Sequence, residues 1–66
     1  MNQDKATLRI QQYANENKID LLKELDRDFN IPLEIKKSCM RIGALRRFDE
    51  VVSYFYNLGI NFILWI

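Results

Sequence analysis

Apolar residues recur every three or four positions along most of this chain, which is the spacing of one face of an α-helix. The pattern predicts an all-α fold of three to four short helices, over residues of about 5–15, 20–29, 32–42 and 50–58. An apolar C-terminal tail, residues 60–66, follows the last helix and is a candidate for a short strand. We expect residues 1–66 to form a single small helical domain.

The first segment, residues 6–13, fits either a helix or a strand. In a helix, Asp4 is the expected N-cap and Leu8 falls outside the apolar stripe. In a strand, the alternation of apolar and polar residues places Leu8 on the buried side. We favour the helix because the glutamines and glutamate that follow are unfavourable in strands. Its apolar stripe comprises Ala6, Ile10, Tyr13 and Ala14.

Two interruptions separate the first three helices. The polar run over residues 15–18 predicts a break, since the apolar stripes on its two sides are out of phase. One continuous helix over residues 5–29 is the alternative, because no glycine or proline interrupts it. Asp20 is the expected cap of the second helix, and Pro32 is expected at the first position of the third. Gly43 is expected to end or kink that third helix, and residues 44–47 either continue it or form a turn.

The last helix carries its own start and stop signals. Asp49 is the expected N-cap, and Gly59 is placed to adopt the left-handed conformation that ends a helix. Ile60 is then positioned for the hydrophobic contact that accompanies such an end. The apolar stripe between these signals comprises Val51, Val52, Phe55 and Leu58.

The tail beyond Gly59 is too apolar to be left in water, so the core of the chain, a second copy or a partner protein is expected to cover it. If it is a strand, its unpaired edge also needs a partner. Tyr54 is expected on the outer side of the last helix, as a residue type common at interfaces. The residues assigned to core or self-association are Tyr54, Phe62, Leu64, Trp65 and Ile66.

The small size of the chain favours association. A domain of this length buries only about 60% of the surface of its unfolded chain, so disulfides, metals or partners usually support it. Cys39 is the single cysteine and histidine is absent, so neither an internal disulfide nor a zinc site is expected. A free cysteine and the lack of an apolar signal segment favour the cytoplasm. Membrane contact is not expected, because the charge-free run over residues 51–66 is shorter than the ~20 residues that cross a bilayer.

Catalysis has little support in this composition. Acid–base chemistry without histidine needs a carboxylate or lysine with a shifted pKa, and the close acidic pairs are one or two residues apart, so they do not share a helix face. Cys39 lies midway along an apolar helix face, where a cysteine is usually core. Neither glycine belongs to a phosphate-binding loop. We therefore expect no enzyme activity, cofactor or small-molecule substrate.

Positive charge is concentrated in residues 33–48, which carry five cations against the single carboxylate of Glu34. Such a cationic segment attracts phosphates or acidic protein surfaces, although a solvated helix face has the same composition. The candidate binding surface comprises Leu33, Lys36, Lys37, Met40, Arg41, Arg46 and Arg47.

The residues KELDRDFNIPLEIKK, at positions 23–37, resemble the helix-turn-helix segments of bacterial regulators. The resemblance implies that Asn30 takes the left-handed turn position and that Asp26 stands where the family has a small residue. It implies a DNA-reading face formed by Lys36, Lys37, Met40 and Arg41. It places Ile35, Cys39 and Ile42 in the core.

These features predict a small non-enzymatic regulatory module that acts by binding another protein and is itself a homodimer. The alternative is a helix-turn-helix DNA-binding regulator that uses the basic helix at residues 33–42. Salt separates the two, because phosphate contacts weaken steeply with salt and apolar interfaces do not.

Overall fold

The computed structural model describes residues 2–60, and these residues form an all-helical domain. Its four α-helices are α1 (Gln3–Asn15), α2 (Ile19–Asp28), α3 (Leu33–Arg46) and α4 (Asp49–Asn57). The predicted all-α fold is therefore confirmed. The expected short strand at the C-terminus concerns residues that, apart from Ile60, lie outside the described part of the chain.

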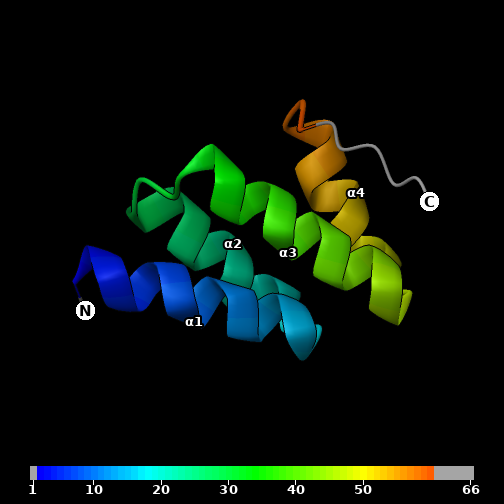
Figure 1. Ribbon diagram of the computed structural model, residues 1–66, viewed down its shortest axis with the longest axis horizontal. Coiled ribbons are helices and arrows are strands. Elements are labelled where there is room, and N and C mark those ends of the chain that lie inside the picture. Colours follow the sequence, from blue (N-terminus) through cyan, green and yellow to red (C-terminus); the bar gives the residue numbers. More distant parts are fainter. Residues whose placement is uncertain (1, 61–66) are drawn as a thin grey trace.

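Helix α3 is the central element, since it packs against α1 on one side and α4 on the other, while α2 packs mainly against α1 (Figure 1). Two hydrogen bonds hold α1 alongside the region of α3. The side-chain amide of Gln3 donates to the carbonyl of Asn30 at 2.6 Å, and the Ser38 hydroxyl donates to the Gln11 side chain at 3.5 Å. Both bonds join residues 27 positions apart, so α1 and α3 run in the same direction.

A single core joins all four helices. Its buried residues also include Ile31, in the turn before α3, and Ile60, just after α4. Helices of 9–14 residues are marginal in isolation, so this shared core rather than helix propensity stabilises them. The core consists of Ala6, Ile10, Ala14, Leu22, Leu25, Ile31, Cys39, Met40, Val51, Phe55 and Ile60.

The segment at residues 6–13 is helical, and the predicted break after α1 is confirmed. Leu8 projects outward, as the helical pattern requires. The chain leaves α1 at Asn17, whose φ of 58° is left-handed, and the Lys18 amide donates back to the carbonyl of Tyr13 at 2.9 Å. Asparagine tolerates this conformation better than most residues, which explains a helix end without glycine.

The predicted helix caps are wrong. Asn2 rather than Asp4 caps α1, because its side chain accepts a 2.8 Å hydrogen bond from the Lys5 amide. The other two capping aspartates, Asp20 and Asp49, lie inside the first turns of α2 and α4, which begin without a side-chain cap. These three helices begin earlier than the predicted caps, so the aspartates lie in their first turns. There the negative charges interact favourably with the helix dipole instead of capping backbone amides.

Helix α3 is longer than predicted at its C-terminal end. Pro32 is its N-cap, with φ of −61° and ψ of 149°, rather than its first helical residue. Gly43 does not end the helix, which continues to Arg46 and ends where Arg47 turns left-handed. Gly43 instead allows α4 to approach closely, since a Cβ at this position would lie 2.7 Å from Val51 Cγ1.

Replacing Gly43 by alanine is expected to destabilise the fold by about 1–3 kcal/mol, because the new methyl group overpacks against Val51. Helix propensity alone predicts the opposite sign, a gain of about 1 kcal/mol. Urea unfolding followed by circular dichroism measures the difference. A Val51→Gly background removes both Val51 atoms that lie within 3.0 Å of the new methyl group, Cγ1 and Cβ. There the same substitution should be much less harmful, and equal destabilisation in both backgrounds would contradict the close-approach explanation.

The end of α4 follows the sequence prediction. Gly59 has φ of 88°, its amide donates to the Tyr56 carbonyl, and the Ile60 amide donates to the Phe55 carbonyl at 3.1 Å. This pair of hydrogen bonds is the Schellman arrangement, and the buried Ile60 supplies its hydrophobic contact. The prediction for Leu58 is wrong, because its side chain is exposed at the end of the helix.

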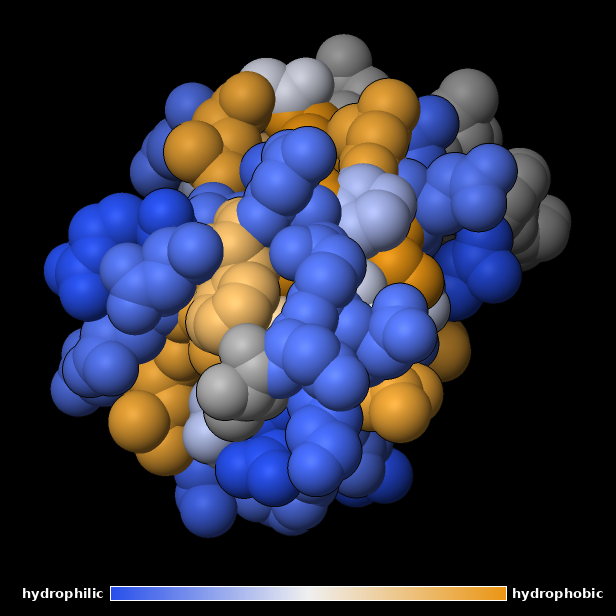
Figure 2. Space-filling model, turned by 90° about the vertical axis from the view of Figure 1, so that its left-hand side faces the viewer, coloured by the Kyte–Doolittle hydropathy of each residue, from blue (hydrophilic) through white to orange (hydrophobic). Residues whose placement is uncertain are grey.

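The described surface is predominantly polar on the end that carries the N-terminus of α1. Hydrophilic side chains cover most of this face, and hydrophobic ones form separate patches between them (Figure 2). Within residues 2–60, no helix combines the length and apolar character needed to cross a membrane.

Candidate interaction surface

A stripe of four exposed residues runs along the outer side of α3. Leu33, Lys37, Arg41 and Leu45 follow one another at intervals of four, so they lie on successive turns of the helix, each about 40° further around its axis than the one before. Leu33 is 54% exposed and Leu45 is 73% exposed, and both cations between them are exposed. We call these four residues the α3 stripe.

Three of the sequence-predicted binding residues, Leu33, Lys37 and Arg41, lie in the α3 stripe. Arg46 and Arg47 are also exposed, at the C-terminal end of the helix. The sequence prediction did not include Leu45. Because α3 continues past Gly43, the spacing of four residues from Arg41 places Leu45 on the same exposed stripe.

Two other predicted binding residues point elsewhere. Met40 is buried in the core, because α3 is covered by α1 and α4 on two sides and its buried arc is wider than a single stripe. Lys36 is only partly exposed and forms an ion pair with Asp26 of α2, with Nζ 3.3 Å from Oδ1. Met40 therefore does not contribute to an exposed surface.

A shallow hollow lies at the C-terminal end of the α3 stripe. It is lined by Ile42, Leu45, Arg46 and Phe48. Three of these side chains are apolar and one is cationic, so the hollow can take an apolar side chain that has a carboxylate beside it.

A polar cluster ties α2 to α3 and α4. The Asp26 side chain is 9% exposed, and its Oδ2 accepts a 2.6 Å hydrogen bond from the Tyr54 hydroxyl of α4. Its Oδ1 is buried and accepts no hydrogen bond, but it forms the ion pair with the ammonium group of Lys36. Burial, reinforced by the hydrogen bond to Asp26, raises the pKa of Tyr54. Tyr54 therefore lies partly buried in an intramolecular contact, which corrects its predicted position on the outer side of α4.

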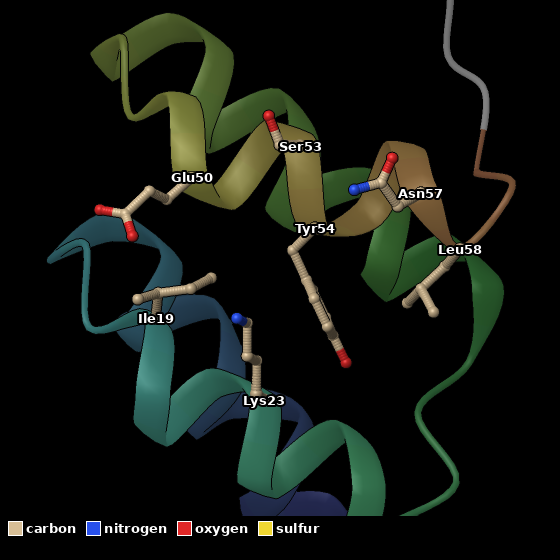
Figure 3. Close-up of a pocket in the computed structure, with 7 residues that line it drawn as sticks. All are labelled: Ile19, Lys23, Glu50, Ser53, Tyr54, Asn57 and Leu58. Atoms are coloured by element: carbon tan, nitrogen blue, oxygen red, sulfur yellow. The ribbon is translucent and has the colours of Figure 1, made fainter.

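A groove between α2 and α4 passes beside this cluster. Figure 3 shows Tyr54 projecting from α4 into the space above α2, where Lys23 Nζ lies 5.7 Å from the centre of the tyrosine ring. That distance is within the range of a cation–π contact. The groove is lined by Ile19, Lys23, Glu50, Ser53, Tyr54, Asn57 and Leu58.

Replacing Tyr54 by phenylalanine is expected to destabilise the fold by about 1–3 kcal/mol, because it leaves Oδ2 of the partly buried Asp26 carboxylate without its donor. Urea unfolding measures the change. Tyr56→Phe is the matched control, since Tyr56 lies on the same helix and is exposed. A Tyr54→Phe variant as stable as the control would show that the hydrogen bond contributes nothing.

Cys39 is placed as core and not as a nucleophile. The side chain is fully buried, and burial together with the negative charge of Asp26 raises the pKa of its thiol to about 12. Nucleophilic cysteines have a lowered pKa and access to solvent, and Cys39 has neither. Among the residues that the structure describes, no cluster of three or more histidine, cysteine or acidic side chains could hold a metal ion.

The segment that resembles a helix-turn-helix retains part of that pattern. α2 and α3 are joined by the short turn at residues 29–32, with Ile31 buried and Ile35, Cys39 and Ile42 in or against the core. Asn30 is not left-handed, since the non-glycine residues with positive φ between positions 2 and 60 are Asn17 and Arg47. The implied turn conformation at Asn30 is therefore wrong.

Comparison of the chain with protein-family models, curated proteins and solved structures finds no match.

Proposed function

We propose that this chain is a small non-enzymatic regulatory module that binds another protein through the α3 stripe. The observation that carries the proposal is the exposure of Leu33 and Leu45 at the two ends of an exposed pair of cations. Exposed leucines on a rigid helix supply apolar contact area, and the cations between them supply electrostatic selectivity. The stripe lies on the central helix of the fold, so its geometry is fixed by packing on two sides.

Peptide display tests this proposal without a known partner. A library of randomised peptides is selected on the immobilised full chain, and the enriched peptides are measured against a Leu33→Ser/Leu45→Ser variant. We expect at least tenfold weaker binding to that variant, because both apolar anchors are removed. The matched control is Leu21→Ser/Leu58→Ser, which removes two exposed leucines outside the stripe. Enriched peptides that bind all three proteins equally would overturn the proposal.

The proposal includes a homodimer, held by the apolar residues Phe62, Leu64, Trp65 and Ile66, which lie outside the described residues. The support is their composition together with the small size of the domain. Sedimentation of the full chain and of a version without residues 61–66 tests it. The shorter version keeps Ile60, which belongs to the core and to the end of α4. We expect a dimer that becomes a folded monomer, and a monomeric full chain would end the homodimer proposal.

DNA binding through α3 is the second candidate. The exposed cations Lys37, Arg41, Arg46 and Arg47 favour it, whereas Lys36 is engaged with Asp26. A random duplex titrated at low and moderate salt tests this candidate, since each phosphate contact adds to the salt dependence. Binding that falls steeply with salt and is lost in a Lys37→Ala/Arg41→Ala variant would favour DNA over protein.

A further inference from the structure

We infer that the partner of the α3 stripe is an acidic amphipathic helix of a different protein, and not a second copy of this chain. The inference rests on the proposed function and identifies the chemistry of its partner. It starts from the dimensions of the stripe. Leu33 and Leu45 are twelve residues apart on one helix, which corresponds to about 18 Å along its axis. Lys37 and Arg41 divide this length into three equal steps.

Self-pairing through the stripe is unfavourable in both orientations. In an antiparallel pair, Leu33 would face Leu45 of the second copy, but Lys37 would face its Arg41. In a parallel pair, Lys37 would face Lys37 of the second copy, and Arg41 would face its Arg41. Both arrangements bring four positive charges together between the leucines, and like charges at an interface cost several kcal/mol. The leucines alone are compatible with a symmetric dimer, so the cations decide against it.

A partner helix that satisfies the whole stripe needs two apolar residues with carboxylates between them. Apolar residues eleven positions apart lie on nearly the same face of a helix and span about 16 Å, close to the rise of about 18 Å between the two leucines along α3. Because the stripe winds around α3, the partner helix crosses α3 obliquely, along the ridge that residues at intervals of four form. Acidic residues four and seven positions after the first of these share that face and reach Lys37 and Arg41. One anchor can enter the hollow formed by Ile42, Leu45, Arg46 and Phe48.

The charges at the two ends of α3 also orient the partner. Glu34 is exposed beside Leu33 in the first turn, whereas Arg46 and Arg47 are exposed beside Leu45. A partner with additional acidic residues therefore places them toward the C-terminal end of α3, where two further cations are available.

Three synthetic peptides of eighteen residues test the inference on the full chain. The acidic peptide has leucine at its fourth and fifteenth positions and glutamate at its eighth and eleventh, in an alanine- and glutamine-rich helix. The basic peptide has lysine in place of both glutamates, and the polar peptide has serine in place of both leucines. Fluorescence anisotropy at low salt gives the dissociation constants. We expect the acidic peptide to bind at least tenfold more tightly than either of the others.

Charge reversal on the protein supplies the decisive comparison. A Lys37→Glu/Arg41→Glu variant should prefer the basic peptide, while a Lys5→Glu/Arg9→Glu variant should keep the preference for the acidic one. The second variant makes the same change in net charge, also at exposed positions four apart, but on α1. Circular dichroism confirms that both variants fold. Equal binding of acidic and basic peptides to the unmodified chain, or a reversed preference in both variants, would overturn the inference.

Two further outcomes separate this inference from the proposals on which it rests. Display-selected peptides that require Leu33 and Leu45 but carry no net negative charge would contradict the inference of an acidic partner helix. The proposal that the stripe binds a protein would still stand. A random DNA duplex that binds through Lys37 and Arg41 when the acidic peptide does not would show that the partner is a nucleic acid, and the inference would be wrong.

Discussion

A Phe55→Ala variant is expected to lose about 3–5 kcal/mol of folding free energy, the largest effect of a single core truncation in this domain. Phe55 is fully buried, and its ring packs edge-to-face with Tyr54 at a centroid distance of 5.1 Å. Removal of the ring therefore opens a cavity where α4 meets the core.

The expected loss is comparable to the whole stability of the domain. At roughly 0.05–0.15 kcal/mol per residue, a chain of this size has about 3–10 kcal/mol in total. Urea unfolding should therefore show a variant that is partly or wholly unfolded in buffer. Tyr56→Ala is the matched control, because Tyr56 is 64% exposed on the next position of the same helix and should change stability by less than about 0.5 kcal/mol. Phe55→Leu should recover most of the loss, and a stable Phe55→Ala variant would refute the assignment of this core.

Local signals in the sequence predicted those parts of the fold that depend on local geometry. Gly59 ends α4 because glycine adopts a left-handed backbone without strain, and the polar run after Asn15 separates α1 from α2. The exposure of Leu8 followed from the helical pattern alone. The helix starts were displaced by one or two residues, because several acidic residues near a helix start satisfy the same sequence preference.

The errors on α3 have one physical cause, which is that this helix is covered on two sides. Cys39 and Met40 are about 100° apart around the helix, yet both are buried, one toward each side of a wide apolar arc. A single-stripe interpretation places Met40 among the cations and treats Gly43 as a helix end. The close approach of Val51 to Gly43 depends on the packing of α4, which no local pattern contains.

The candidate surface could be predicted only in part, because some of its residues depend on how neighbouring helices pack against α3. Lys37 and Arg41 lie at the centre of the exposed side of α3, so the helical pattern of the sequence alone predicts that they are exposed. Lys36 lies at the edge of that side, and its pairing with Asp26 depends on the position of α2. Asp26 was recognised as unusual for a helix-turn-helix segment, and the structure explains it, since this carboxylate accepts from Tyr54 and pairs with Lys36.

Stability is expected to fall steeply above pH 9, because burial makes the Cys39 thiol ionise at a higher pH in the folded chain than in the unfolded one. The ordinary pKa of the thiol is 9.0, and burial with the charge of Asp26 raises the pKa of Cys39 to about 12. Below pH 9 the thiol is protonated in both states, so it has no effect on the balance. Between pH 9 and 12 the unfolded chain loses the proton and the folded chain keeps it, so each pH unit favours unfolding by about 1.4 kcal/mol. The loss reaches roughly 4 kcal/mol at pH 12.

Tyr54 adds to this loss, because burial and its hydrogen bond to Asp26 raise the pKa of its phenol above the ordinary value of 10.0. Urea unfolding at pH 8, 9, 10 and 11 measures the slope, and Cys39→Ala isolates the thiol, since the remaining titrating groups are common to both proteins. The variant should be less stable at pH 8 but should lose less stability on the way to pH 11. Native Cys39 that reacts with iodoacetamide at pH 9.5 as fast as a free thiol would contradict the raised pKa. Parallel slopes for the two proteins would show that alkaline unfolding has another origin.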